Sequence, residues 1–106
     1  MLRIYPVILE VLKKLQPVLR RIELKDRDLG RQLRRCSSSI ALNVAEGMYS
    51  RGKNRGARYH TALGSARETL ACLEVGDALH GLRVPESLCG ELDAICLLYT
   101  SDAADE

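Results

Sequence analysis

Between Leu29 and Val44, apolar side chains recur at steps of four, three, four and four residues. The set is Leu29, Leu33, Cys36, Ile40 and Val44. This spacing is typical of one face of an α-helix, and such a face needs a second apolar surface to cover it. We therefore predict a helix from near Asp28 to Glu46 that packs against other helices. Gly47, which can adopt a left-handed conformation, is predicted to end it.

Two more segments show the helical period. The first runs from about residue 5 to residue 24 and contains Pro17, which is expected to kink it or divide it into two shorter pieces. The other follows a basic connection, has Asn54 as its predicted cap, and runs to about His80. Gly81 is its predicted stop.

A fourth helix begins at Pro85 and Glu86 and carries Leu88, Leu92 and Ile95 on one face. The chain has no Trp and no Phe, so its core must be aliphatic. Four amphipathic helices with short connections bury their apolar faces most simply in an antiparallel bundle. The predicted fold class is all-α: an antiparallel up-and-down four-helix bundle over residues 1–95, with a truncated fourth helix.

Residues 96–106, CLLYTSDAADE, resemble the translation of a transposon end joined to a sequencing adapter, so we exclude them from the predicted domain. Without them the acidic count falls from 14 to 11 against 16 Lys plus Arg, and the net charge rises from +2 to +5. We expect the natural sequence after Ile95 to differ. Leu98 and Tyr99 fall in phase with the fourth helix, which is therefore expected to continue into the tail.

The composition argues against several classes of protein. Cys36, Cys72 and Cys89 form no CxxC pair and are odd in number, which is typical of reduced, buried thiols in the cytoplasm. Charged residues interrupt the N-terminal apolar stretch, so neither a signal peptide nor a membrane span is predicted. His60 and His80 are too far apart for helical metal-ligand spacing. We predict a cytoplasmic protein with no metal and no cofactor.

Two patterns that could suggest catalysis are weak. GMYSRGK at residues 47–53 has the spacing of a phosphate-binding loop, but Asn54 replaces the Ser or Thr that would hold magnesium, and a helix precedes the segment instead of a strand. Ser38 or Cys36 with His60 is a nominal nucleophile and base, but the sequence offers no orienting acid and no oxyanion site. We predict no catalytic residues and no enzyme activity.

Positive charge is the main functional signal, since no acidic residue occurs between Glu46 and Glu68. A rigid bundle is expected to display this basic segment beside the arginines of the second helix. The predicted nucleic-acid-binding residues are Arg31, Arg34, Arg35, Arg51, Lys53, Arg55 and Arg58. Only Tyr49 and Tyr59 lie near for base stacking, so backbone contact is expected instead of base reading. A solvated basic surface with no binding role is the alternative.

The segments LRRCSSSIALNVAEG (33–47) and RYHTALGSARETLACLEVGDAL (58–79) resemble a bacterial four-helix bundle family. That family includes proteins encoded in intervening sequences of 23S ribosomal RNA genes and the accessory variability determinant of diversity-generating retroelements. The resemblance implies a homo-oligomeric bundle, a pentamer in the accessory protein, whose basic surface binds nucleic acid and which partners a reverse transcriptase. This sequence departs from the pattern at Ala41, where many relatives carry proline.

No catalytic residues carry over from this resemblance. Asn43 is assigned to helix packing as a buried amide, and Glu46 and Gly47 to packing and termination. The function predicted is a non-enzymatic, oligomeric protein that binds RNA or an RNA/DNA hybrid, as an accessory to a reverse transcriptase. The alternative is a structural homo-oligomer or a protein-interaction scaffold with no nucleic-acid role.

Overall fold

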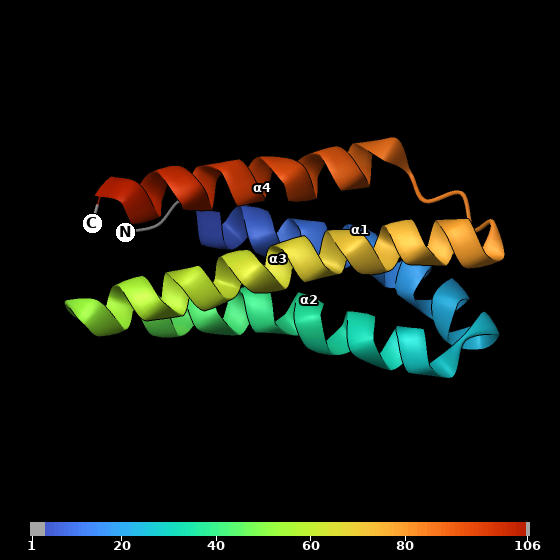
Figure 1. Ribbon diagram of the computed structural model, residues 1–106, viewed down its shortest axis with the longest axis horizontal. Helices are drawn as coiled ribbons and strands as arrows, with labels where there is room; N and C mark the ends of the chain where they lie inside the picture. Colours follow the sequence, from blue (N-terminus) through green and yellow to red (C-terminus); the bar gives the residue numbers. More distant parts are fainter. Residues whose placement is uncertain (1–3, 106) are drawn as a thin grey trace.

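The computed structural model describes the backbone of residues 4–105 and the side chains of residues 4–97. Its four helices are α1 (Ile4–Lys25), α2 (Arg27–Met48), α3 (Lys53–His80) and α4 (Glu86–Asp105). They lie side by side, each running opposite to the one before it, in a bundle about 42 Å long (Figure 1). The predicted antiparallel four-helix bundle is confirmed, and α4 is shorter than α3, with 20 residues against 28.

The core lies along the bundle axis and is mainly aliphatic, as the composition requires. Its most deeply buried large side chains are Ile8, Val11, Leu15, Ile22, Leu33, Ile40, Val44, Thr69, Leu73, Leu92 and Ile95. The predicted apolar face of α2 is confirmed from Leu33 to Val44, whereas Leu29 is only half-buried. The predicted face of α4 is buried at all three positions.

Two helix ends show how local chemistry sets the boundaries. Asp26 caps α2, because its Oδ1 accepts a hydrogen bond of 3.0 Å from the backbone N–H of Leu29. Gly81 ends α3 in the left-handed conformation, at φ 60°, as predicted. The prediction that Asn54 caps α3 is wrong: the helix already includes Lys53, and Gly52 precedes it at φ 60° without a side-chain cap.

Gly47 does not end α2, so that prediction is wrong. The helix continues to Met48, and its C-cap is Tyr49 at φ −103°. Gly47 is buried under the ring of Tyr59: a Cβ added to it would lie 2.3 Å from the ring's Cε1 atom. The glycine is therefore required by close packing between α2 and α3, which helical periodicity within one segment does not reveal.

α1 continues through Pro17, so the predicted division into two shorter helices does not occur. Pro17 has no N–H to bond the carbonyl of Lys13, but its ring lies on the exposed side of the helix. The core-facing side chains on either side of it, Leu15 and Val18, keep the helix against the bundle.

α4 continues to Asp105 and so extends into the predicted tail, as expected from its phase. The side chains of Leu98 and Tyr99 lie outside the described residues, but Cys96 is buried against the core. Within the described part of the chain, no helix is both long and apolar enough to span a membrane.

Candidate nucleic-acid interface

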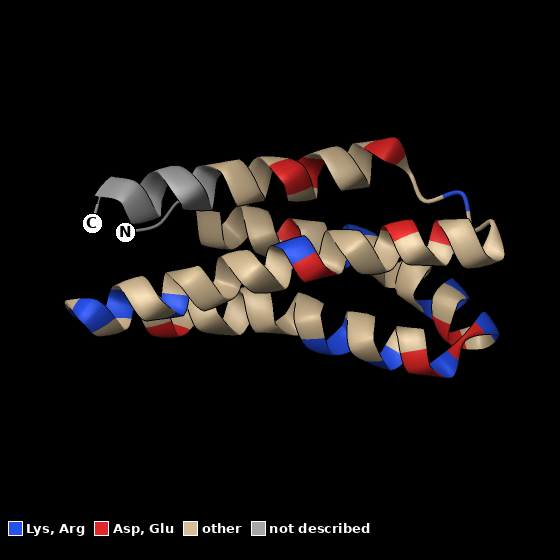
Figure 2. Ribbon diagram, viewed as in Figure 1, with Lys and Arg blue, Asp and Glu red and all other residues tan. Residues whose placement is uncertain are grey.

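The seven predicted binding residues do not form one cluster. α2 is one continuous helix that rises about 1.5 Å per residue, so Arg31 lies about 25 Å along the axis from the C-terminal end of α2. Figure 2 shows basic residues in the N-terminal half of α2 and again at the opposite end of the bundle, where α3 begins. The expectation that the basic segment lies beside Arg31, Arg34 and Arg35 is therefore wrong for Arg51, Lys53 and Arg55.

Arg34 separates from its neighbours because it faces α1. Its Nη2 lies 2.8 Å and its Nε 3.3 Å from Oε2 of Glu23. This carboxylate offsets part of the charge that Arg34 could offer to an anion. Nη1 of Arg31, three positions earlier, lies 4.0 Å from Oδ1 of Asp28, a side chain that is itself almost fully exposed.

Arg35 and Arg58, although 23 residues apart in the sequence, line one hollow of about 360 Å³ between α2 and α3. A second hollow of about 430 Å³ adjoins it, because Arg35 and Ser39 line both, and it reaches Arg31 and Glu68. We call the two hollows together the α2–α3 groove. The groove places three of the seven predicted residues, Arg31, Arg35 and Arg58, along one surface.

A chain of hydrogen bonds forms the floor of this groove. Oγ of Ser39 accepts from Nδ2 of Asn43 at 2.9 Å and from the hydroxyl of Ser65 on α3 at 2.8 Å. Deeper in the interface, Thr69 donates to the carbonyl of Ser65 at 2.8 Å. Asn43 is half-buried beside the α2–α3 contact, close to where the sequence placed it, and Nη1 of Arg58 reaches its Oδ1 at 3.4 Å.

The basic residues around the start of α3 differ in their contacts. Arg58 pairs with Glu46 at 3.0 Å, and Nε of Arg55 donates to the carbonyl of Gly47 at 3.3 Å. Arg35, Arg51 and Lys53 are exposed and have no carboxylate partner among the residues that the structure describes. No carboxylate in the described residues therefore competes with an external anion for these three side chains.

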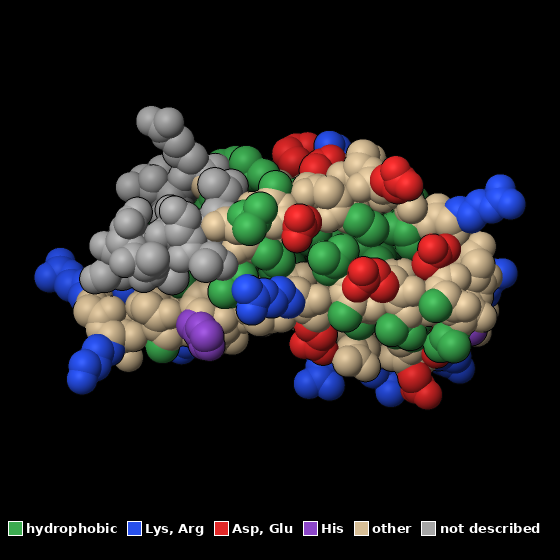
Figure 3. All heavy atoms as spheres, turned by 45° about the horizontal axis from the view of Figure 1, so that its top comes forward, with side chains coloured by type: hydrophobic (Ala, Val, Ile, Leu, Met, Phe, Trp, Pro, Cys, Tyr) green, Lys and Arg blue, Asp and Glu red, His purple; other side chains and the backbone are tan. Residues whose placement is uncertain are grey.

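Charge is distributed unevenly over the whole surface. The face that α4 forms with the C-terminal half of α3 carries mainly acidic side chains around apolar ones (Figure 3). Its acidic residues are Glu74, Asp77, Glu86, Glu91 and Asp93. This face would repel a polyanion.

The structure does not assemble the nominal catalytic pair. His60 is exposed on α3, and the hydroxyl of Ser38 donates to the carbonyl of Arg34 at 2.8 Å. Burial raises the pKa of the Cys36 thiol and raises that of its neighbour Cys72 to about 12, so both are protonated at neutral pH. Among the described residues, no group of three or more His, Cys, Asp and Glu side chains could hold a metal ion.

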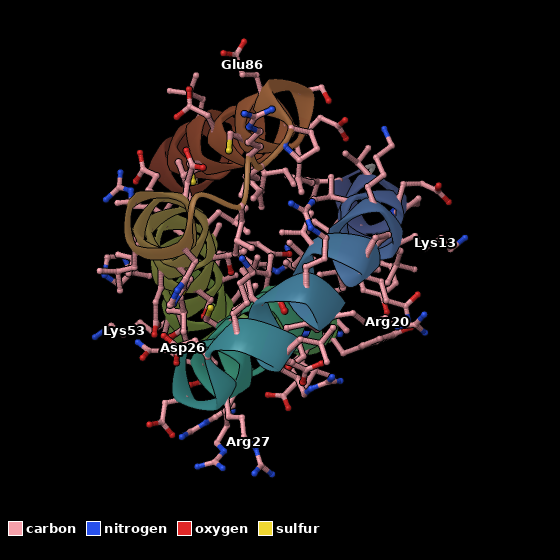
Figure 4. The ribbon with its side chains drawn as sticks, turned by 90° about the vertical axis from the view of Figure 1, so that its right-hand side faces the viewer. Lys13, Arg20, Asp26, Arg27, Lys53 and Glu86 are labelled. Carbon is pink, nitrogen blue, oxygen red and sulfur yellow. The ribbon has the colours of Figure 1, made fainter. Side chains whose placement is uncertain are left out.

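One polar contact was not predicted from the sequence. Nε2 of His80, near the end of α3, lies 3.0 Å from Oδ2 of Asp26, at the end of the bundle where Figure 4 labels the aspartate. The N–H of Leu29 and then His80 lower the pKa of Asp26 below its ordinary value of 3.8. The two residues are 54 positions apart in the sequence, so no local pattern predicts that they meet.

A second concave surface lies between α1 and α2 and exposes more apolar than polar area. It has a volume of about 790 Å³ and is lined by leucines that include Leu9, Leu12 and Leu19, with Lys13 and Arg20 at its edge. Figure 4 shows Lys13 and Arg20 extending outward from α1. This concave surface meets the α2–α3 groove at Ser38, which lines both surfaces.

Comparison with known families gives a match over most of the chain. A family model described as 23S rRNA-intervening sequence protein matches residues 2–97, which include α1, α2, α3 and the first part of α4. No curated protein and no solved structure matches the chain.

Proposed function

The chain belongs to the 23S rRNA-intervening sequence protein family, and from this premise we propose that it binds nucleic acid without catalysis, through contacts to backbone phosphates. The observation that carries the proposal is the set of basic side chains along α2 and the start of α3, three of which have no carboxylate partner in the described residues. The contacting residues are Arg31, Arg35, Arg51, Lys53, Arg55 and Arg58, with Arg34 weakened by Glu23.

The physical basis is counterion release. Each Lys or Arg that neutralises a phosphate displaces condensed ions, so the affinity falls as the salt concentration rises. Each such contact adds about 0.7–0.9 to the magnitude of the slope of log K against log salt. Six such contacts give a slope of about −4 to −5. The ligand we propose is RNA or an RNA/DNA hybrid in the cytoplasm, with a reverse transcriptase as the protein partner that the family resemblance implies.

Filter binding of the full chain to a structured RNA tests this proposal. We expect affinity to fall by about 10²–10³ between 50 and 200 mM salt, as six phosphate contacts require. The same titration with uncharged peptide nucleic acid as competitor should show no competition. A flat salt response would contradict the proposal.

A second candidate function, self-association, rests on the apolar surface between α1 and α2. Leu9 at this surface and Val7 beside it are 38% and 47% exposed, and a soluble bundle gains by covering such a surface. We propose that the chain forms a homo-oligomer, a pentamer by resemblance, through this surface. Light scattering should give an oligomeric mass that Leu9→Glu lowers to the monomer mass of 11.8 kDa; a monomeric unmodified chain would exclude self-association.

A further inference from the structure

The α2–α3 groove is not uniformly basic. Glu68 on α3 lines the same hollow as Arg31 and Arg35. Its Oε2 accepts a hydrogen bond of 3.0 Å from Nε2 of Gln32, and within the described part of the chain it forms no ion pair with either arginine. A carboxylate at this position opposes phosphate binding, so the hollow suits a ligand that brings hydrogen-bond donors together with an anionic group.

The floor of the groove supplies a hydroxyl that can only donate. A serine hydroxyl has one proton and two lone pairs. Both lone pairs of Ser39 are occupied, by Asn43 at 2.9 Å and by Ser65 at 2.8 Å. Because Ser39 lines both hollows, its remaining capacity is that of a hydrogen-bond donor to an acceptor placed in the groove.

The first hollow, of about 360 Å³, provides apolar surface. Leu42 is 62% exposed there, Arg35 from α2 and Arg58 from α3 line the same hollow, and Arg35 and Ser39 join it to the hollow of Glu68. Arginine planes and apolar side chains both take the face of an unstacked base. Hollows of about 360 and 430 Å³ are in the range of sites for small organic molecules, and either has room for one nucleotide.

We propose that the α2–α3 groove binds an unpaired guanine nucleotide of the nucleic-acid strand. Guanine presents two adjacent donors, N1–H and the N2 amino group, to the carboxylate of Glu68, and next to them the acceptor O6, to which Ser39 or Arg31 donates. Arg35 contacts the phosphate of the same nucleotide. In a duplex, N1–H, the N2 amino group and O6 of guanine are all hydrogen-bonded to cytosine. The groove therefore selects a guanine in a single-stranded segment.

This inference rests on the proposed nucleic-acid binding and names what one part of that surface reads. It differs from the expectation that scarce aromatics leave only backbone contact. Here carboxylate, hydroxyl and guanidinium groups provide the base contacts, so base recognition does not require aromatic side chains.

Two RNA hairpins of equal length and charge test the proposal. One has a guanine in its single-stranded loop, and in the other that guanine is adenine. Fluorescence anisotropy at one salt concentration should show that the full chain binds the guanine hairpin about tenfold tighter, the discrimination typical of one good base contact.

Variants on α3 locate the preference. Glu68→Gln leaves the hydrogen bond to Gln32 possible but replaces one acceptor with a donor, so the tenfold preference should vanish. The matched control is Glu74→Gln, another exposed carboxylate on α3 that does not line the groove, and it should keep the preference.

The outcomes separate this inference from the proposed function. Equal binding of both hairpins with a steep salt dependence overturns the guanine site and leaves phosphate binding in place. A preference that survives in Glu68→Gln also overturns the assigned site. If neither hairpin binds at low salt, the proposed function fails and the guanine site fails with it.

Discussion

At Gly47 the absence of a side chain lets the ring of Tyr59 pack against the backbone of α2. An alanine there would place Cβ at 2.3 Å from Cε1 and 2.7 Å from Cδ1 of a ring that is only 2% exposed. The ring has little room to move, so Gly47→Ala should lower the free energy of unfolding by about 1–3 kcal/mol. Urea denaturation followed by circular dichroism measures this change.

Gly64 is the matched control within α3. A Cβ added to Gly64 meets no atom within 4 Å, and the residue lies in a helix interior. Gly64→Ala should therefore raise the free energy of unfolding by about 0.5–1 kcal/mol, because alanine loses less backbone entropy. The same substitution at two helical glycines is thus expected to change the free energy of unfolding in opposite directions. Equal changes would contradict the packing assigned to Gly47.

Asp26 should make stability depend on acid pH. Its pKa is lowered in the fold by the N–H of Leu29 and by His80, so the folded state binds its proton less readily than the unfolded chain. The stability that this group contributes is fully present above its ordinary pKa of 3.8 and is lost as pH falls through the lowered value. Asp26→Asn should reduce the loss of Tm below pH 4.

The control for Asp26 is its neighbour Asp28, which has the same charge and also lies near the start of α2. Its side chain is 95% exposed and lies 4.0 Å from Nη1 of Arg31. Asp28→Asn should leave the acid part of the Tm profile close to that of the unmodified chain. If both variants change the profile equally, the pair of Asp26 with His80 is not its cause.

Among the elements, the presence and the extent of a helix could be predicted wherever the pattern lies within one segment of the sequence. The apolar period located the four helices, and Gly81 was found as a stop because left-handed geometry is a property of that residue. The errors at Gly47 and Asn54 have another origin: packing against Tyr59 and the turn at Gly52 depend on a second element or on the connection.

Pro17 is the element-scale case in which tertiary packing outweighs local propensity. A proline within a helix costs up to about 3 kcal/mol, yet α1 is continuous because Leu15, Val18 and Leu19 are buried in the bundle. Since Pro17 itself is exposed, Pro17→Ala should restore a hydrogen bond without disturbing the core and raise the free energy of unfolding by about 1–3 kcal/mol.

Thermal or urea unfolding checks this prediction, with Gln16→Ala as the control. Gln16 is also exposed on α1, and the exchange of glutamine for alanine changes helix propensity only slightly. A stabilisation by Pro17→Ala no larger than that by Gln16→Ala would mean that the proline costs α1 nothing in its present setting.

At the scale of the whole molecule, the candidate site was predictable in its residue types but not in its arrangement. Clusters of arginine in the sequence indicated a polyanion surface. The length of α2 then separates Arg51 from Arg31, while the antiparallel return of α3 brings Arg58 to Arg35 and Glu68 to the same groove. Which side chains meet across two helices depends on their register, and the sequence does not state that register.

The whole-molecule account therefore predicts that nucleic-acid binding depends on where positive charge lies and not on its total. Arg35→Ala, Arg51→Ala and Lys53→Ala together remove three exposed cations of the proposed surface, each without a carboxylate partner in the described residues. Lys13→Ala, Arg20→Ala and Lys25→Ala remove the same charge from exposed positions on α1.

The slope of log K against log salt for a structured RNA, measured for the unmodified chain and for both triple variants, tests the central claim most directly. We expect the first triple variant to lose about 2–3 from the magnitude of the slope, since each lost phosphate contact removes about 0.7–0.9. The α1 variant should keep the slope of the unmodified chain. Equal slopes for the two triple variants would contradict a nucleic-acid surface on α2 and the start of α3.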